Sequence, residues 1–430
     1  MVGEARLERA DRSQVRLEVL DVEGLVPAGH RVRAVWAFVS GLDLSRFHDA
    51  IRAREGHAGR PAIDPAILLC LWLYATLDDV GSARELERLT RLHNIYRWIC
   101  GGVSVNHHTL SDFRVEQAAF LDELLARAVV ALMDAGVASL EEVAQDGLRT
   151  RASAGGGSFR RRATLEKRLD EARARVARLK AELKSDPAAS GKRRAAAQAR
   201  AARQAEEKAR AALDNLAEIE KRRERSRKDH GRRIEAQKEP RASLTDPQAR
   251  VIKMADGGFR PAYNLQVAMD TASGAVVGVQ VSNDTSDKGL VEPMLERIGQ
   301  RFSKRPKRWL ADTGYASKHT AEQLANAPEG GIEAYMPIPT GFGRTAPRMP
   351  PVKMAGARAW HARMDTPEAK AIYKRRSLVE WVNAGMRNRG LTRLTVRGMA
   401  KVEAVLLWQA VAHNLLCLFR NGIHSLPAAA

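Results

Sequence analysis

The sequence predicts a multidomain α/β protein with a helical N-terminal domain and a second domain that contains a β-sheet. Three observations predict this organisation. Residues 1–136 repeat apolar side chains at three- and four-residue spacing, residues 262–282 alternate apolar and polar side chains, and a charged heptad pattern lies between them. A chain of 430 residues is long enough for two or three domains. We expect domains at 1–136 and 137–425, with the heptad segment, 160–240, inserted in the second.

The N-terminal domain is expected to consist of short amphipathic helices. Three runs show helical spacing most clearly, at 36–47, 64–77 and 121–133. Asp64 is expected to cap the second run, and Pro65 fits its first turn. A further short helix is expected at 82–93.

The heptad segment predicts an antiparallel helical hairpin. Its apolar residues recur at alternating gaps of four and three, the pattern of a coiled-coil seam, at Leu165, Leu169, Ala172, Val176, Leu179 and Leu183. A break is expected at 185–192, followed by a second helix to about residue 228. Residues 158–240 hold 26 Lys and Arg against 14 Asp and Glu. Contact with DNA, contact with another subunit and a merely solvated surface all stay open for this charge.

The second domain is expected to contain strands joined by turns and helices. Its first strand is predicted at 142–147, ending in a turn, and a tight turn at 271–273 separates two alternating strands. The other predicted elements are strands near 308–311 and at 332–338, a helix at 288–299, a loop at 342–358, and helical structure from 367 to 419.

The charge of the chain indicates a polyanionic partner. The formal net charge is +20, more than solubility needs, and it favours a nucleic acid over a merely basic, adhesive protein. The three cysteines lie far apart and lack metal-ligand spacing, so a reducing cytoplasm is expected. The N-terminal sequence has no apolar signal-peptide core. The most apolar stretch, 402–419, contains polar residues and is expected to be a buried helix and not a membrane span.

Two aspartates are candidates for chemistry because they follow predicted strands and precede glycine turns. Asp146 precedes Gly147, and Asp312 precedes Thr313 and Gly314. A carboxylate in this position lies at the rim of a sheet, where it can meet a substrate. Taken singly, an aspartate in such a position is more often an ordinary turn or capping residue.

A third carboxylate lies on a predicted helix at 371–390. At 100° per residue, Tyr373, Arg376, Glu380 and Arg387 fall at about 0°, 300°, 340° and 320°, on one narrow face. One carboxylate among two guanidinium groups suits a site that holds a metal ion and phosphate together. The alternative is a solvated surface on which Arg376 and Glu380 form an i,i+4 pair.

Three carboxylates are the ligand set that two-metal phosphoryl transfer requires. Two divalent ions about 3.5–4 Å apart activate the nucleophile and stabilise the leaving oxygen. Mg²⁺, or Mn²⁺ in its place, takes such oxygen ligands. Asp146 is expected to bridge both ions, with Asp312 on one and Glu380 on the other. The candidates for DNA contact are Tyr373, Lys374, Arg375, Arg376 and Arg387 in the helix, with Arg84 and Arg114 in the N-terminal domain.

The motifs resemble those of bacterial insertion-sequence transposases of the DDE class. Tyr373, Arg376 and Glu380 match the Y-x2-R-x3-E-x6-K signature of that group, with Arg387 in place of its lysine. The segments DGLRTRAS and LADTGY resemble the two aspartate blocks, and residues 60–102 with NHHTLSDFR resemble the N-terminal domain of the group. The resemblance covers most of residues 20–420.

This resemblance implies a fold, an activity and partners. It implies a ribonuclease-H-like core, a mixed five-stranded sheet flanked by helices with the three acids at one edge and the hairpin inserted after the first strand. It also implies a bacterial, nucleoid-associated enzyme that binds terminal inverted repeats and target DNA as a homo-oligomer, cuts the repeats and joins the ends. The competing hypotheses are a catalytically inactive DNA-binding derivative, a nuclease or recombinase of the same fold, and a scaffold built on the basic hairpin.

Overall fold

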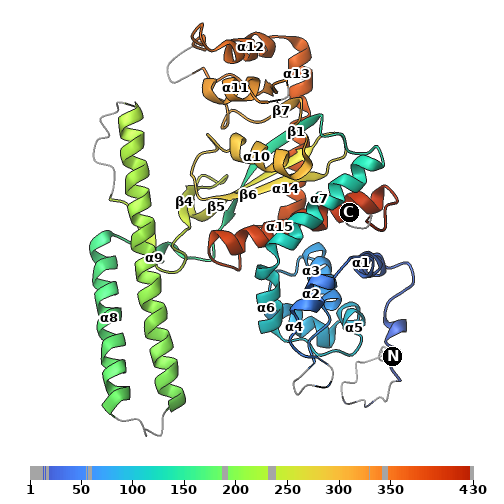
Figure 1. Cartoon of the computed structure of the whole chain (residues 1–430), viewed down its shortest axis with the longest axis vertical. Helices are drawn as coiled ribbons and strands as arrows, with labels where there is room; N and C mark the ends of the chain where they lie inside the picture. The colour runs from blue at the N-terminus through green and yellow to red at the C-terminus, as the bar shows by residue number, and fades with distance from the viewer. Residues whose placement is uncertain are drawn as a thin grey trace, which may run out of the picture.

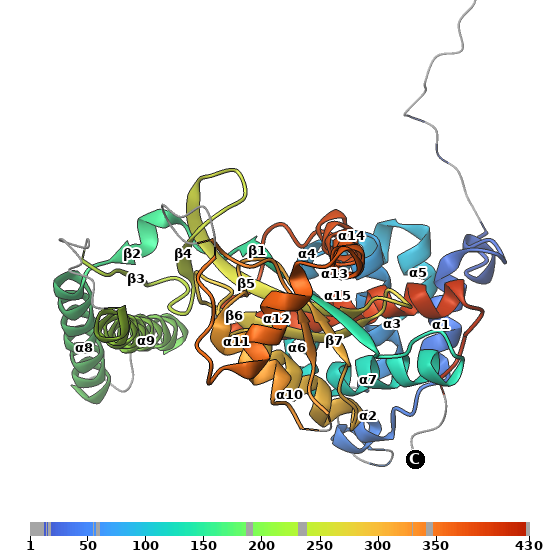
Figure 2. The ribbon, with the colours of Figure 1, turned by 90° about the horizontal axis from the view of Figure 1, so that it is seen from above.

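A computed structural model shows a mixed sheet between a helical N-terminal region and a projecting pair of long helices (Figures 1 and 2). The structure describes Ser13, Val15, 19–54, Gly56, 61–185, 192–230, 239–328, 330–340 and 347–426. The predicted break at 185–192 falls almost wholly outside these residues, as does part of the predicted loop at 342–358. The α/β class expected from the sequence is confirmed.

The N-terminal region is helical, as its apolar spacing predicted. Its elements are a 3₁₀ turn at Glu23–Leu25 and the helices α1 (Arg31–Ser40), α2 (Ser45–Ala50), α3 (Pro65–Leu77), α4 (Ala83–Leu92), α5 (Asn94–Cys100), α6 (His107–Glu116) and α7 (Ala118–Asp134). Asp64 caps α3 by accepting a hydrogen bond from the backbone N–H of Ala66 at 2.8 Å. The run at 36–47 is divided between α1 and α2, because α1 ends at Ser40 and Gly41 follows it.

The sheet has five positions across its width. Its strands are β1 (Glu142–Arg151), β4 (Arg250–Lys253), β5 (Phe259–Asp270), β6 (Val276–Ser282), β7 (Arg308–Leu310) and β8 (Glu333–Tyr335). The central strand β1 pairs antiparallel with β5 and parallel with β7, and β7 pairs parallel with β8. Both β4 and β6 pair with β5, so two short strands share the outermost position.

Helices cover the two faces of this sheet. They are α10 (Val291–Phe302), α11 (Lys318–Ala325), α12 (Ala355–Met364), α13 (Pro367–Lys374), α14 (Ser377–Asn388) and α15 (Met399–Arg420). Gln145 donates to the backbone oxygen of Leu290, just before α10, whereas Asp146 accepts from Asn383 of α14. Adjacent strand residues point to opposite faces, so α10 and α14 cover opposite sides of β1.

Helix α15 is a core helix. By length and composition it is the single helix among the described residues that is apolar enough to cross a membrane, yet 83% of its most apolar window is buried inside the protein. Its Asn414 accepts from the N–H of Val276 and donates to the carbonyl of the same residue, both at 2.8 Å, which fastens the helix to β6. The sequence predicted a buried helix here, and the burial fits that prediction.

Two long helices, α8 (Arg162–Ser185) and α9 (Lys192–His230), lie side by side and project from the sheet (Figure 1). Ion pairs join Arg162 to Glu220 and Arg173 to Glu206, so the two helices run antiparallel. Leu165, Ala212 and Leu216 are buried between them. Short strands β2 (Phe159–Arg160) and β3 (Ala242–Ser243) pair at the base of this helical pair.

Three sequence predictions about the second domain were wrong in detail. Strand β1 does not end at residue 147 but continues to Arg151, because the long strand β5 pairs with it throughout. The predicted helix at 371–390 is two helices, since the N–H groups of Arg375 and Arg376 bond three residues back instead of four. The predicted loop at 342–358 gives way to α12 at Ala355.

Candidate active site

Asp146 lies in the middle of β1, at the point where its parallel neighbour ends. The last paired residues of β1 and β7 are Ala144 and Leu310, and Asp146 stands two residues beyond Ala144. On its other side Asp146 stays paired with Val267 of β5. The carboxylate is therefore carried by a rigid central strand, which was expected to end here.

Asp312 stands in the equivalent place on the neighbouring strand. It lies two residues beyond Leu310, as Asp146 lies two beyond Ala144. Its Oδ1 accepts from the N–H of Gly314 at 2.7 Å, which fixes the turn after β7. The register of two parallel strands thus brings the first two predicted acids to one edge of the sheet.

Both aspartates line a cleft of about 560 Å³. Arg387 of α14 lines the same cleft, together with Arg149 of β1. Further lining residues come from β1, the β4–β5 turn, β5, the loop between β6 and α10, and the segment after α14: Gly147, Arg151, Met254, Ala255, Asp256, Arg260, Asp287, Leu391 and Thr392. Both acidic and basic side chains line it, which suits a phosphate group held beside a cation.

Glu380 reaches this site through Arg376. Glu380 is in the first turn of α14, its side chain is 56% exposed, and it forms an ion pair with Arg376. Arg376 also interacts electrostatically with Asp146 and lies 5.8 Å from the centre of the Tyr373 ring. Glu380 is not among the residues that line the cleft. The structure therefore brings the three acids to one region, with an arginine between the third and the first.

The environment of Asp146 makes its ionisation costly without a cation. The pKa of Asp146 is raised to about 6, chiefly by burial, and the nearby charge of Asp312 acts in the same direction. The backbone of Gly147, the charge of Arg376 and a hydrogen bond from Asn383 Nδ2 at 2.9 Å act in the opposite direction. A bound cation would stabilise the charged form of this carboxylate, which is the form that ligates a metal ion.

A fourth carboxylate, Asp287, was missed by the sequence analysis. It accepts hydrogen bonds from Asn264 at 2.7 Å and from Gln266 at 3.1 Å, and it lines the cleft. A Cβ on Gly314 would lie 2.9 Å from Asp312 Oδ1 and 3.2 Å from Asp287 Oδ2. The two carboxylates therefore flank a residue that has room for no side chain. No sequence signal marks Asp287, because the loop that carries it has no strand or helix pattern.

The other residues predicted to contact DNA differ in their exposure to solvent and in their contacts. Arg84 and Lys374 are exposed. Arg375 does not line the cleft and pairs with the buried Glu142, its Nε lying 2.7 Å from the carboxylate.

Arg114 is buried, in contrast to the surface position expected for a DNA contact. It donates to the carbonyl of Gly81 at 2.7 Å and to Thr395 at 3.1 Å, and its guanidinium lies 4.6 Å from the ring centre of Trp72. Burial lowers the pKa of Arg114 to about 10. Its side chain thus joins α6 to the segment before α15, and it does not face solvent in this conformation.

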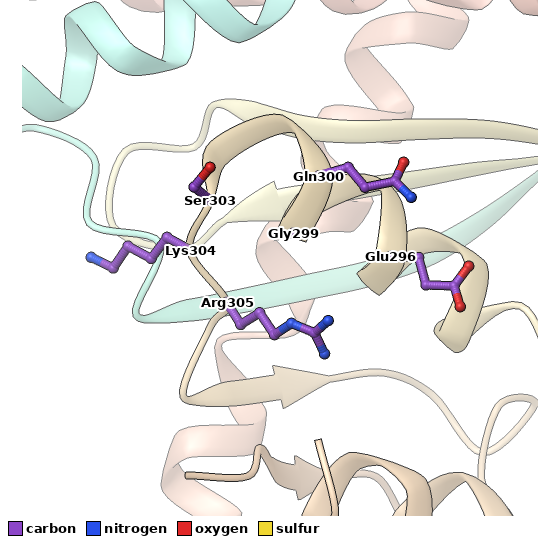
Figure 3. Close-up of a pocket in the computed structure, with 6 residues that line it drawn as sticks. All are labelled: Glu296, Gly299, Gln300, Ser303, Lys304 and Arg305. Atoms are coloured by element: carbon purple, nitrogen blue, oxygen red, sulfur yellow. The ribbon is translucent and has the colours of Figure 1, made fainter. Parts of the chain in front are cut away.

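Another pocket, of about 530 Å³, lies at the C-terminal end of α10 (Figure 3). Its polar side chains are Glu296, Gln300, Ser303, Lys304 and Arg305, and they do not converge on one point. Lys304 instead donates to the carbonyl of Ser139 at 2.8 Å. None of the predicted catalytic residues lines this pocket, so we place the candidate site in the cleft at the sheet edge.

The residues at the sheet edge fit a hard divalent cation in their chemistry. Asp146 and Asp312 supply carboxylates, and the Oδ1 atom of Asn383 is buried without a hydrogen-bond partner. Within the described part of the chain, no three His, Cys, Asp or Glu side chains gather closely enough to form a ready-made metal cluster. Mg²⁺ keeps several waters and binds through one or two carboxylates, so this donor set suits it.

Comparison with protein families identifies the class. Residues 234–415 match the transposase DDE domain, and residues 20–116 match a second transposase domain. Searches of curated proteins and of solved structures find no match. The chain is a transposase.

Within that class, the chain belongs to the transposases with a DDE domain. The DDE match contains Asp312 and Glu380. Asp146 and both long helices fall between the two matched segments, so neither match covers them.

Proposed function

We propose that this protein cuts DNA at terminal inverted repeats and joins the freed ends to target DNA, as an insertion-sequence transposase. The observation that carries the proposal is the meeting of Asp146 and Asp312 at one sheet edge, in a cleft that Arg387 also lines. The transposase family of the chain supports DNA as the substrate. The net charge of +20 supports DNA binding through phosphate contacts, and the affinity for DNA is then expected to fall as the salt concentration rises.

We also infer a ribonuclease-H-like core. When strands β1, β5, β6, β7 and β8 are numbered one to five along the chain, their order across the sheet is 3-2-1-4-5. The second strand is antiparallel to the first. This order supports the inference, as does the position of both aspartates at the edge between the first and fourth strands.

Different side chains would have different roles in phosphoryl transfer. Asp146, Asp312 and Glu380 would hold divalent ions, which supply activation of the attacking oxygen and stabilisation of the leaving oxygen. Arg387 is placed to contact a phosphate oxygen in the cleft, and the exposed Lys374 and Arg84 extend the basic surface. The positive charge of Arg376 attracts both Glu380 and Asp146, and it would hold the two carboxylates near one another.

We further propose that the protein acts as a homo-oligomer, because two DNA ends must be held together before they are joined. The domain limits expected from the sequence, 1–136 for DNA binding and 137–425 for catalysis, are part of this proposal. The end of α7 at Asp134 and the start of β1 at Glu142 support the division.

The experiment that tests the proposed function compares two aspartate substitutions. Asp312→Asn is expected to reduce Mg²⁺-dependent cleavage of inverted-repeat DNA by about 10³-fold, since ligands to such ions contribute several kcal/mol. Asp365→Asn removes an exposed aspartate at the end of α12, outside the cleft, and is expected to leave cleavage unchanged. Equal rates for the two variants would show that Asp312 is not part of the catalytic site.

A further inference from the structure

Asn383 is a buried polar residue whose side-chain amide forms a hydrogen bond through its nitrogen but not through its oxygen. Its side chain is 3% exposed, and its Nδ2 donates to Asp146 Oδ2 at 2.9 Å. Its Oδ1 atom is buried and has no hydrogen-bond partner. An unpaired buried acceptor costs about 1–3 kcal/mol. The position therefore favours a ligand that this oxygen can bind.

The place of Asn383 on α14 points to the same cation as the carboxylates. It is three residues after Glu380 and four before Arg387, so all three lie along one stripe of the helix. Arg376, at the start of that stripe, interacts electrostatically with Asp146. The stripe that the sequence identified by its charges thus has a neutral oxygen donor at its centre.

An amide can present either its oxygen or its nitrogen to Asp146. The two arrangements differ by a half-turn of the amide and have the same shape. With the oxygen toward the carboxylate, two acceptors face one another, which is unfavourable unless a cation lies between them. After this half-turn a divalent cation would bind the Asp146 carboxylate and the amide oxygen together, and the amide nitrogen would lie where the oxygen lies now. Asparagine carbonyl oxygens are ordinary ligands of hard cations.

We propose that Asn383 is an oxygen ligand of the divalent cation that Asp146 binds. The inference rests on the proposed function and deepens it, because it adds a neutral amide to the three carboxylates. It gives α14 two oxygen ligands, from Glu380 and Asn383, so cation binding fastens this helix to β1. In the cation-free protein the amide nitrogen takes over by donating to Asp146.

A hydrogen-bonding role alone is the competing account. In that account Asn383 only orients Asp146 through Nδ2, and its oxygen never contacts the ion. The two accounts differ for Asn383→Asp, which keeps the shape and an oxygen but loses the N–H donor. A ligand tolerates this substitution, whereas a donor does not.

The test is a Mn²⁺ titration of the full-length protein without DNA, in which electron paramagnetic resonance follows free Mn²⁺. Asn383→Leu is expected to weaken Mn²⁺ binding by about 10–100-fold, the usual effect of losing a group that supports a metal site. Asn383→Asp is expected to bind Mn²⁺ at least as tightly as the unaltered chain. Asn388→Leu, an exposed position on the same helix, is the matched control and is expected to have no effect.

Two results would overturn the role of Asn383. One is unchanged Mn²⁺ affinity in Asn383→Leu, and the other is an equal loss of affinity in Asn383→Asp and Asn383→Leu. Thermal unfolding without Mn²⁺ checks that each variant is folded, and Asn383→Ala replaces the leucine variant where leucine does not fit. Absence of Mn²⁺ binding by the unaltered chain would overturn the proposed function too, which distinguishes the two failures.

Discussion

Asp146→Asn is expected to reduce cleavage of inverted-repeat DNA by about 10³-fold or more, the loss that corresponds to several kcal/mol of metal-ion stabilisation. The same variant is expected to bind that DNA as tightly as the unaltered chain, or slightly more tightly. The substitution changes the charge of one partly buried group and leaves its shape, so it separates catalysis from binding.

Asp146 should have the largest effect because the other site groups converge on it. It interacts with the charges of Asp312 and Arg376, and it accepts a hydrogen bond from Asn383. Its strand, β1, is the central strand of the sheet, so another carboxylate cannot easily move into the position of Asp146.

The measurement is single-turnover cleavage in Mg²⁺, with DNA affinity measured in parallel by mobility shift in Ca²⁺. Asp365→Asn again serves as the control outside the cleft. Cleavage by Asp146→Asn at the rate of the unaltered chain would remove Asp146 from the catalytic site. Loss of DNA binding together with cleavage would indicate a binding or folding role in its place.

Arg376→Met is expected to lower cleavage by about 10²-fold, the scale seen when one preorganised charged or hydrogen-bonding group is removed from an active site. Its guanidinium pairs with Glu380 and interacts with both Asp146 and Tyr373, and its side chain is 17% exposed. Methionine keeps much of the packing and removes the charge, so Glu380 loses its partner.

Arg376→Lys is the informative companion. Lysine restores the charge but not the planar fork that can serve two groups at once, so only a small part of the rate should return. The comparison uses the cleavage rate at saturating DNA together with DNA affinity. Full activity in the methionine variant would mean that the Arg376–Glu380 pair is merely a surface ion pair.

The parts of the fold that depend on local sequence could be predicted. The cap of α3 follows from Asp64, whose side chain accepts a hydrogen bond from the first turn of the helix. The alternation at 262–282 gave strands β5 and β6 and the turn between them. Asp312 follows β7 as expected, because a short apolar strand before a glycine turn is a local pattern.

Features that depend on distant partners could not be predicted. The length of β1 comes from pairing with β5, more than a hundred residues away in the chain. The burial of Arg114 depends on Gly81 and Thr395, which no pattern around residue 114 reveals.

Two site residues escaped the sequence analysis for different reasons. Asp287 is in a loop, and only its tertiary neighbours Asn264 and Gln266 define its place. Asn383 lies on the same helical stripe as Glu380 and Arg387, but its neutral side chain does not stand out in a pattern defined by charge. A neutral side chain inside a charged stripe is therefore worth testing as a site residue.

The most direct test of the central claim uses DNA that carries the inverted repeats flanking the gene itself. The unaltered chain and a variant with Asp146, Asp312 and Glu380 all changed to alanine are incubated with this DNA, in Mg²⁺ or in EDTA, and the cut and joined ends are sequenced. The account predicts cuts at the repeat boundaries and joined products, only with the unaltered chain and only in Mg²⁺. Cutting at the same boundaries by the triple variant, or by the unaltered chain in EDTA, would contradict it.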